Sequence, residues 1–554
     1  MQKNKLFTLL IYSYLALPFF IFSAGFLKWY FAIPVCACIL AAVFLSCRDS
    51  KAMFSLPFER FTALRITGGI VIIIAMVLLS GIGNVLWQNN DHATRNTLFD
   101  ILVNYSWPPK YITDAGNEVG IVYYIGFWLP SALLGKITSL GMGYVFQIIW
   151  AVLGLSIIWY LLCVIHKKIV IYPLVIFLFF GGMDIIGHRL VTVLYDQLTN
   201  LQIGTWAFSQ GSALTTHIEW WSAYYQYSSH TTQLFWVFNQ CLPVWIATLV
   251  LLLEKNNKNL VFIMGLTLLS STLPFIGLIP IFVWCAVCNH EDGLLTRSLT
   301  KDVKHSFFSL FTFQNVAGGG LSGIISFLYL IGNIASTTSS ASAAASAAVQ
   351  SSEKSFSLPV FFEVFAVGAA LVCLSYFKGS RKLWKFAYFA PLLLLAYLMA
   401  KTKPIKLEFY LLFILLEFIL LALVIFPACR KSSLFYISLF CLLIIPFFTV
   451  GKSIDFCMRA SIPLLVVLCL FSLEALKKYF NTEKQLLATL LCIILMLGAL
   501  TPVKEIARTI EATAYEIETK GKVVNNNKTE HQVFGGKNFT GRTKDSFFFE
   551  ILAK

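Results

Sequence analysis

The sequence predicts an all-α fold, a polytopic transmembrane helical bundle, and two observations carry this prediction. The chain of 554 residues is 58% hydrophobic and only 12% charged, with a mean hydropathy of +0.77, whereas soluble domains are about 25% charged. The charges fall in short runs between apolar blocks of about 17 to 25 residues, and each block is long enough to cross the hydrocarbon core of a bilayer. This composition excludes a soluble globular enzyme.

Apolar segments of this length predict about 13 to 16 spans. Residues 1–47 open with a basic run and an apolar run, as a cleaved signal peptide does. A second apolar block starts at Trp29 and favours a retained helical hairpin instead. The remaining spans are expected near residues 67–86, 143–165, 168–182, 234–253, 259–272, 274–289, 308–331, 358–376, 386–401, 406–427, 433–450, 460–476 and 485–501.

The distribution of positive charge predicts how these spans are oriented. The net charge of +15 is spread over small Lys and Arg clusters between apolar segments, so orientation in a membrane explains it better than a nucleic-acid partner does. The basic connections are assigned to the cytoplasm, and the polar segments 87–142 and 183–233 face outward. The chain then divides into an N-terminal hairpin with its cytoplasmic loop (1–66), a catalytic-type module with two large outer loops (67–253), a C-terminal transmembrane module (254–501) and an extracytoplasmic tail (502–554).

Residues 121–137 are predicted to form an interfacial or re-entrant helix rather than a full span. A crossing here would place the basic run 166–168 on the outer side, against the positive-inside rule. Tyr123, Tyr124 and Trp128 suit the membrane boundary, where amphipathic rings are favoured.

The first outer loop carries a cluster of charged side chains, with Asp91, His92 and Arg95 close together. A short helix starting near Asp91 would place Asp91 and Arg95 on one face and offer the apolar residues of 98–102 to the bilayer. Asp91 is then either the helix cap and the partner of Arg95, or the general base for a hydroxyl acceptor. The pattern leaves both interpretations open.

Two further clusters lie in the second outer loop. Asp184, His188 and Arg189 follow the predicted span 168–182, and a later run combines acid, imidazole and aromatic groups. Aromatic rings beside carboxylates suit a carbohydrate site, since sugar C–H faces stack on rings and hydroxyls need directional acceptors. An interfacial aromatic belt is the alternative. The candidate site residues of this run are His217, Glu219, Trp220, Trp221, Tyr224 and His230.

His217, Glu219 and His230 could also bind a divalent metal ion, because imidazole and carboxylate are ligands for zinc or a hard divalent cation. A fourth cluster, Lys452, Asp455 and Arg459, precedes the span 460–476. The Arg459 guanidinium could bind a lipid phosphate through two parallel hydrogen bonds. Alternatively, Asp455 and Arg459 could form a structural pair at i, i+4.

One acid, Glu417, lies within the predicted span 406–427. A proton-coupled transporter would need such a group, but a hydroxyl or amide of a neighbouring helix would also satisfy it. We expect the structural role.

These residues resemble the GT-C superfamily, the integral membrane glycosyltransferases that use polyprenyl-phosphate-linked sugars. An outer loop carries Asp91 near its start, a Trp-Pro-Pro segment (107–109), and a Tyr-Tyr interfacial helix that ends in Leu-Leu-Gly (133–135). The later segment DFCMRASIP (455–463) is similar to an outer-face motif of bacterial proteins of this type. The resemblance covers roughly residues 67–240 and 450–465. His92 stands where a second carboxylate is common, and two additional spans precede the loop.

The resemblance implies that Asp91 is the catalytic base, Glu219 or Asp184 an auxiliary acid, and Arg459 the anchor of the donor phosphate. It implies a bacterial inner-membrane protein with its active site on the extracytoplasmic side, acting on a polyprenyl-phosphate-sugar donor and a glycan or lipid acceptor. A lipid donor agrees with the lack of a nucleotide-binding fingerprint in the sequence. A flippase for a lipid-linked glycan, and a glycan polymerase or ligase, are the alternatives. The side chains expected to contact substrate are His92, Arg95, His188, Arg189, His217, Trp220, Trp221, Tyr224, Lys452, Asp455 and Arg459.

Overall fold

The computed structural model describes residues 2–50, 62–114, 116–198, 217–222, 224–290, 297, 302–344, 407–448, 454–482, 484–524, 527–536, 539–544 and 546–554. The chain forms two compact units. Unit 1 comprises Met1–Phe180, Ser229–Ser346 and Pro502–Lys554, and unit 2 comprises Gly181–Ser228 and Ala347–Thr501. The predicted spans 358–376 and 386–401 and the residue Lys452 lie outside the described residues.

A multi-pass membrane protein is confirmed. In the described part of the chain, eight helices are long and apolar enough to cross a membrane, and most of the structure is helical. They are Lys5–Phe26, Trp29–Asp49, Thr62–Leu79, Leu140–His166, His230–Leu253, Gln314–Asn333, Phe409–Cys429 and Gln485–Lys520.

Two predicted spans are wrong as continuous crossings. Within 168–182 the helix α7 has seven residues (Tyr172–Leu178), and within 259–272 the helix α11 has nine (Leu260–Leu268), far fewer than the roughly 20 that a straight crossing needs. The first ends before Gly181 and Gly182, because glycine is a poor helix former. After the second, the Ser271 hydroxyl donates to the Gln240 carbonyl oxygen at 2.7 Å.

Unit 1 is built around α10 (His230–Leu253), whose side chains are almost all buried. The helices α1 (Gln2–Phe26), α2 (Trp29–Asp49), α3 (Thr62–Leu79), α6 (Leu140–His166), α12 (Thr272–Val287), α13 (Val303–Phe308) and α14 (Leu321–Ala344) also belong to it. A π-helical segment, η4 (Gln314–Gly320), leads into α14. The short 3-10 segments are η1 (Gly126–Trp128) and η3 (Asn257–Asn259).

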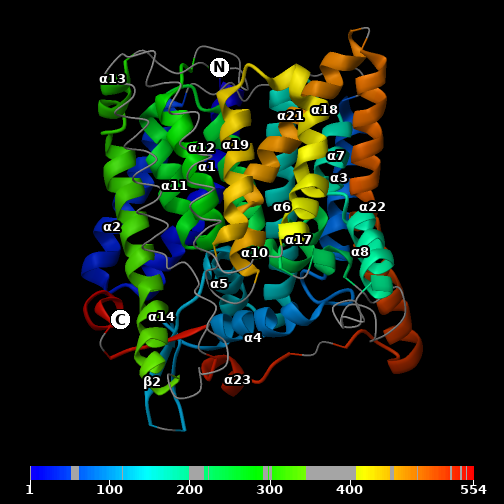
Figure 1. The fold of residues 1–554 in the computed structure, drawn as a ribbon. Coiled ribbons are helices and arrows are strands. Elements are labelled where there is room, and N and C mark those ends of the chain that lie inside the picture. The colour runs from blue at the N-terminus through cyan, green and yellow to red at the C-terminus, as the bar shows by residue number, and fades with distance from the viewer. Residues whose placement is uncertain are drawn as a thin grey trace. The chain divides into compact units, whose positions relative to one another are not determined.

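The segment predicted as the first outer loop, 87–142, contains α4 (Asn90–Asn104), which runs across the direction of α1, α6 and α10 (Figure 1). The helix is confirmed, but the expected contact of its apolar residues with lipid is wrong. Leu98, Phe99, Ile101 and Leu102 are fully buried, and α4 packs against α5, α6 and α23 (Glu530–Phe534). A helical pattern shows that one face is apolar, and here protein covers that face.

Residues 121–137 do not form one continuous helix. Strand β2 (Glu118–Ile121) is followed by η1 and by α5 (Leu129–Ile137), which has nine residues and therefore rises about 13.5 Å. This length excludes a full crossing by α5, as the charge pattern predicted.

The C-terminal tail docks on this loop. Strand β3 (Thr540–Arg542) pairs antiparallel with β2, and β1 (Lys110–Ile112) pairs with the other edge of β2. The terminal π-turn η8 (Phe548–Leu552) contacts α14. The Lys28 amide donates to the Leu552 carbonyl oxygen at 2.9 Å.

Unit 2 contains α8 (Asp184–Leu198), η2 (Ile218–Ser222), α17 (Leu407–Ile414), α18 (Leu420–Cys429), α19 (Ser433–Ile444), η7 (Ile445–Phe447), α20 (Asp455–Ala460) and α21 (Ile462–Phe480). A π-helical turn, η6 (Leu415–Ile419), joins α17 to α18. The long helix α22 (Gln485–Lys520) begins in unit 2 and from Pro502 onward belongs to unit 1.

Candidate functional site

The start of α4 presents a carboxylate to solvent. The Asn89 side chain caps the helix by accepting a hydrogen bond from the Asp91 amide at 3.1 Å, so the interpretation of Asp91 as the cap is wrong. The Asp91 side chain is 47% exposed, and its Oδ2 accepts a hydrogen bond from Arg95 Nη2 at 2.9 Å. The predicted i, i+4 pair is therefore confirmed, with half of the carboxylate open to another molecule.

Arg95, the ion-pair partner of Asp91, is buried. Its side chain is 5% exposed, and its Cζ lies 5.9 Å from the centre of the Phe238 ring. Nη1 is buried with no hydrogen-bond partner among the described residues. Because a guanidinium carries five N–H donors, Arg95 keeps donor capacity beyond its bond to Asp91.

His92 fixes α4 against a kink in α10. Its Nε2 lies 2.9 Å from the Phe235 carbonyl oxygen, and Val237, two residues later, has non-helical angles of φ −138° and ψ 35°. Burial and the nearby Arg95 lower the pKa of His92 to about 4, so the ring is neutral at pH 7. A carbonyl only accepts, so Nε2 carries the proton, and Nδ1 accepts from Gln88 Nε2 at 3.2 Å. We assign His92 a positioning role.

An aromatic and charged cluster, which we call the Arg508 sandwich, lies in the same unit. The Arg508 guanidinium lies 5.5 Å from the Trp87 ring and 5.2 Å from the Trp236 ring. Glu505 Oε2 accepts from Arg508 Nη2 at 2.6 Å and from Trp236 Nε1 at 3.0 Å. These contacts join the loop before α4, the kinked part of α10 and the C-terminal half of α22.

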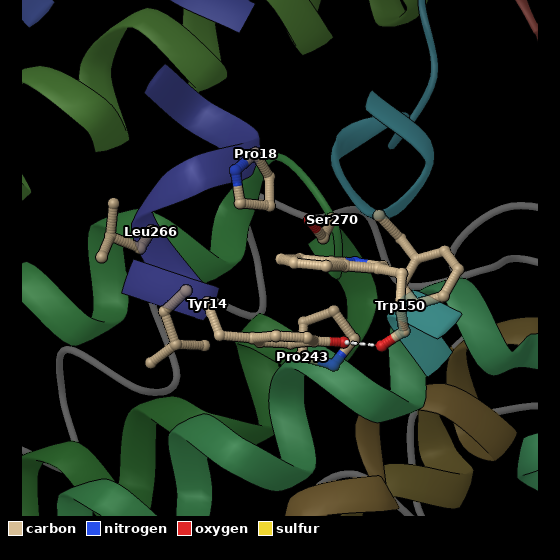
Figure 2. A pocket seen from close by; sticks show the side chains of 8 residues that line it. Tyr14, Pro18, Trp150, Pro243, Leu266 and Ser270 are labelled. Carbon is tan, nitrogen blue, oxygen red and sulfur yellow. Dashed lines mark hydrogen bonds between the residues drawn. The ribbon is translucent and has the colours of Figure 1, made fainter. Parts of the chain in front are cut away.

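A small crevice in unit 1 is lined by side chains from α1, η1, α6, α10 and α11 and by Ser270 (Figure 2). The Tyr14 ring stacks on Trp150 with 4.0 Å between ring centres, and its hydroxyl donates to the Trp150 carbonyl oxygen at 3.3 Å. The free volume is about 10 Å³, room for one water molecule. In this conformation the crevice cannot hold a sugar.

In unit 2 the residues predicted for the second loop form a buried network. Asp184 Oδ1 accepts from Trp221 Nε1 at 3.1 Å, and Asp184 Oδ2 accepts from Thr501 Oγ1 at 3.0 Å. Glu219 Oε2 accepts from Gln226 Nε2 at 2.8 Å and lies 3.5 Å from His217 Nε2. Both predicted auxiliary acids are therefore buried and held by neighbouring side chains.

The aromatic residues of η2 and the segment after it divide into two groups. Trp220 and Tyr224 are exposed, whereas Trp221 is buried. The Trp221 ring fits against Gly187, where an added Cβ would lie 2.4 Å from a ring atom. His188 and Arg189 follow on α8, the first half-buried and the second exposed. The exposed Trp220 ring also contacts His217, with 4.9 Å between ring centres, and the Tyr224 ring contacts Phe409, with 5.9 Å between ring centres.

The three side chains predicted as metal ligands have different surroundings. His217 and Glu219 are neighbours in unit 2. His230 begins α10 in unit 1, where its Nδ1 lies 2.7 Å from the Phe177 carbonyl oxygen. Over the described ranges, no three His, Cys, Asp or Glu side chains gather as metal ligands would.

Arg459 and Asp455 lie four residues apart on α20, with Arg459 Nη1 3.4 Å from Asp455 Oδ2. The predicted pair is confirmed. The Arg459 side chain is 9% exposed and that of Asp455 is 36% exposed, so the acid is the accessible member.

Sequence reasoning missed the Arg508 sandwich. Glu505 and Arg508 are three residues apart in the amphipathic segment after Thr501, and that spacing signals a helical ion pair. No local signal indicated that Trp87 and Trp236 would cover the pair.

Comparisons with known proteins add no assignment, since no family model, no curated protein and no solved structure matches the chain.

Proposed function

We propose that the chain is a membrane glycosyltransferase of the GT-C type, which transfers a sugar from a polyprenyl-phosphate donor to an extracytoplasmic glycan or lipid acceptor. The observation that supports this most is the half-exposed Asp91 carboxylate at the start of a helix that lies across the spans of unit 1, backed by the buried Arg95. A general base must be ionised and accessible to the acceptor hydroxyl, and Asp91 is accessible.

In the proposed reaction the acceptor hydroxyl oxygen attacks the anomeric carbon of the donor sugar. The bond between that carbon and the phosphate oxygen breaks, and the electron pair leaves with the lipid phosphate. Asp91 takes the hydroxyl proton. Arg95 Nη1, which has no described partner, would stabilise the negative charge that develops on the phosphate.

Mass spectrometry of lipid-linked glycans in a deletion strain tests this function. A monosaccharide transferase predicts accumulation of one acceptor that lacks a single sugar. A polymerase or ligase predicts accumulation of complete repeat units on the lipid instead. An unchanged set of lipid-linked species on both sides of the membrane would contradict every reaction of this class.

The turn at residue 139, between α5 and α6, should face the extracytoplasmic side. We expect a glycosylation acceptor inserted there to be modified in a system that glycosylates outer loops, because α5 is too short to return the chain to the cytoplasm. An insertion in the basic segment 378–385 should stay unmodified and serves as the control. The reverse pattern would place α4 and Asp91 in the cytoplasm and remove the proposed reaction.

Arg459→Ala should weaken donor binding with less effect on turnover, since the proposed role of Arg459 is to hold the lipid phosphate. We expect KM for the donor to rise by about tenfold or more, as the loss of a charge-assisted hydrogen bond of about 1.5 kcal/mol or more implies. Asp455→Asn is the matched control, because it disrupts the same ion pair and leaves the guanidinium in place. An equal rise in KM for both variants would show that the pair is structural.

One observation favours the flippase as a second candidate. Glu417 is a buried acid inside the span Phe409–Cys429, and transport paths use such groups. Accumulation of the complete lipid-linked glycan on the cytoplasmic leaflet of the deletion strain would support this candidate.

A further inference from the structure

The backbone around Glu417 has an unusual form. Glu417 lies in the π-helical turn η6, between α17 and α18. Such turns are rare in proteins, and those that occur inside α-helices are often found at functional sites. The Met183 amide donates to the Leu416 carbonyl oxygen at 3.2 Å. A Cβ on Gly182 would lie 1.9 Å from Glu417 Oε2, so glycine at this position is what lets the segment before α8 reach the carboxyl group.

This contact brings two carboxyl groups together. Asp184 follows Gly182 by two residues, and its carboxyl group is a hydrogen-bonding neighbour of the Glu417 carboxyl group. Both residues are at least nine-tenths buried. The two oxygens of Asp184 already accept from Trp221 and Thr501. The Trp221 indole N–H, which donates to Asp184 Oδ1, is also a hydrogen-bonding neighbour of the Glu417 carboxyl group. The hydroxyl or amide partner expected for Glu417 from the sequence is not found in the described part of the chain.

Two ionised carboxylates in this position would repel each other, and both would be buried away from water. A proton on one of the two groups removes one charge and supplies a donor between them, because a protonated carboxyl group donates an O–H hydrogen bond. We propose that Asp184 and Glu417 share one proton at neutral pH and form a proton-binding site that joins the segment 181–184 to the span Phe409–Cys429. This inference does not depend on the reaction proposed above.

The surrounding groups favour the protonated state. Burial, and next the charge of Glu219, raise the pKa of Asp184 to about 7. The π-turn itself carries no other titratable group. Within the described ranges, the other titratable groups that interact with these acids include His217 beside Glu219, and Tyr227 and the Cys457 thiol near Glu417. No described Lys or Arg side chain forms a salt bridge with Asp184 or Glu417.

The sign of the pH effect follows from the raised pKa. The folded state holds its proton up to about pH 7, whereas an unfolded Asp has a pKa of 3.8. The stability due to this proton is therefore fully present below about pH 4 and is lost as the pH rises through about 7.

Infrared difference spectroscopy of the full-length protein in detergent, titrated between pH 4 and pH 9, tests the site. We expect a carbonyl stretch of a protonated carboxyl group that is present at pH 6, shifts in deuterated water and weakens as the pH rises through about 7, where Asp184 ionises. Asp184→Asn and Glu417→Gln should each weaken this band, and the double variant should abolish it. In the wild type, the melting temperature should fall as the pH rises through about 7. This fall should be smaller in each variant, because the amide that replaces the carboxyl group supplies a donor that does not titrate. Glu511→Gln, at an exposed position on α22, is the control and should leave the band unchanged.

Other results would overturn the proposal. A band of unchanged intensity in the double variant would show that the proton lies on other groups. A melting temperature that rises with sodium concentration in the wild type, but not in either variant, would show that a cation occupies the site in place of the proton. If one single variant fails to fold, the other still decides, because a band of unchanged intensity in that variant would contradict a proton shared by the two groups.

Discussion

Asp91→Asn is expected to lose sugar transfer by about a hundredfold to ten-thousandfold, the usual contribution of a general base. The amide cannot take the acceptor proton, but it has nearly the same shape and retains an oxygen that can accept from Arg95 Nη2, now 2.9 Å from Asp91 Oδ2. Folding and donor affinity should therefore change little. The measurement is the rate of transfer from a synthetic polyprenyl-phosphate sugar by the purified protein, with donor affinity and melting temperature measured in parallel.

Asp114→Asn is the matched control for this experiment. Asp114 lies in the same segment, 87–142, between β1 and β2, and its side chain is 83% exposed. It carries the same charge, so a general effect of surface charge on a phosphate-bearing substrate would appear in both variants. Turnover of Asp91→Asn at the wild-type rate would remove Asp91 from the mechanism and leave it as the structural partner of Arg95.

The parts of this site that the sequence predicted are local in the chain. Asp91 with Arg95 and Asp455 with Arg459 are four residues apart, and an α-helix brings residues at that spacing together whatever surrounds it. The length and hydropathy of the apolar segments likewise predict membrane helices, because both follow from the thickness of the bilayer.

The parts that were missed depend on contacts between distant segments. The apolar residues of 98–102 in α4 indicate an apolar surface, yet nothing in residues 90–104 tells whether lipid or protein covers it. Gly182 looks like a helix terminator in the sequence, and only the packed structure reveals that it makes room for Glu417. The pairing of β2 with β3 joins residues more than 400 positions apart, for which a single sequence carries no signal.

The Arg508 sandwich is expected to be the most sensitive point of unit 1 for stability. The side chains of Glu505 and Arg508 are 2% and 7% exposed, and removal of one partner of a buried ion pair costs about 3–5 kcal/mol because the other charge stays buried without compensation. Arg508→Met keeps most of the volume between Trp87 and Trp236 and removes the charge. We expect its free energy of unfolding, measured by denaturant titration in mixed micelles, to fall by about that amount.

A second pair on the same helix separates the effect of burial from that of pairing. Lys520 and Glu516 are also an ion pair, at 3.1 Å, but the Lys520 side chain is 45% exposed. Glu516 is buried and still accepts from the Val524 amide at 2.9 Å when Lys520 is removed, so Lys520→Met should cost less than Arg508→Met. The double variant Glu505→Leu, Arg508→Met should recover most of the stability lost by Arg508→Met, because it leaves no buried charge. If Arg508→Met costs no more than Lys520→Met, the sandwich is hydrated in the membrane. In that case the contacts of the sandwich, which join α10 and α22 to the loop before α4, would not be what fixes the position of Asp91.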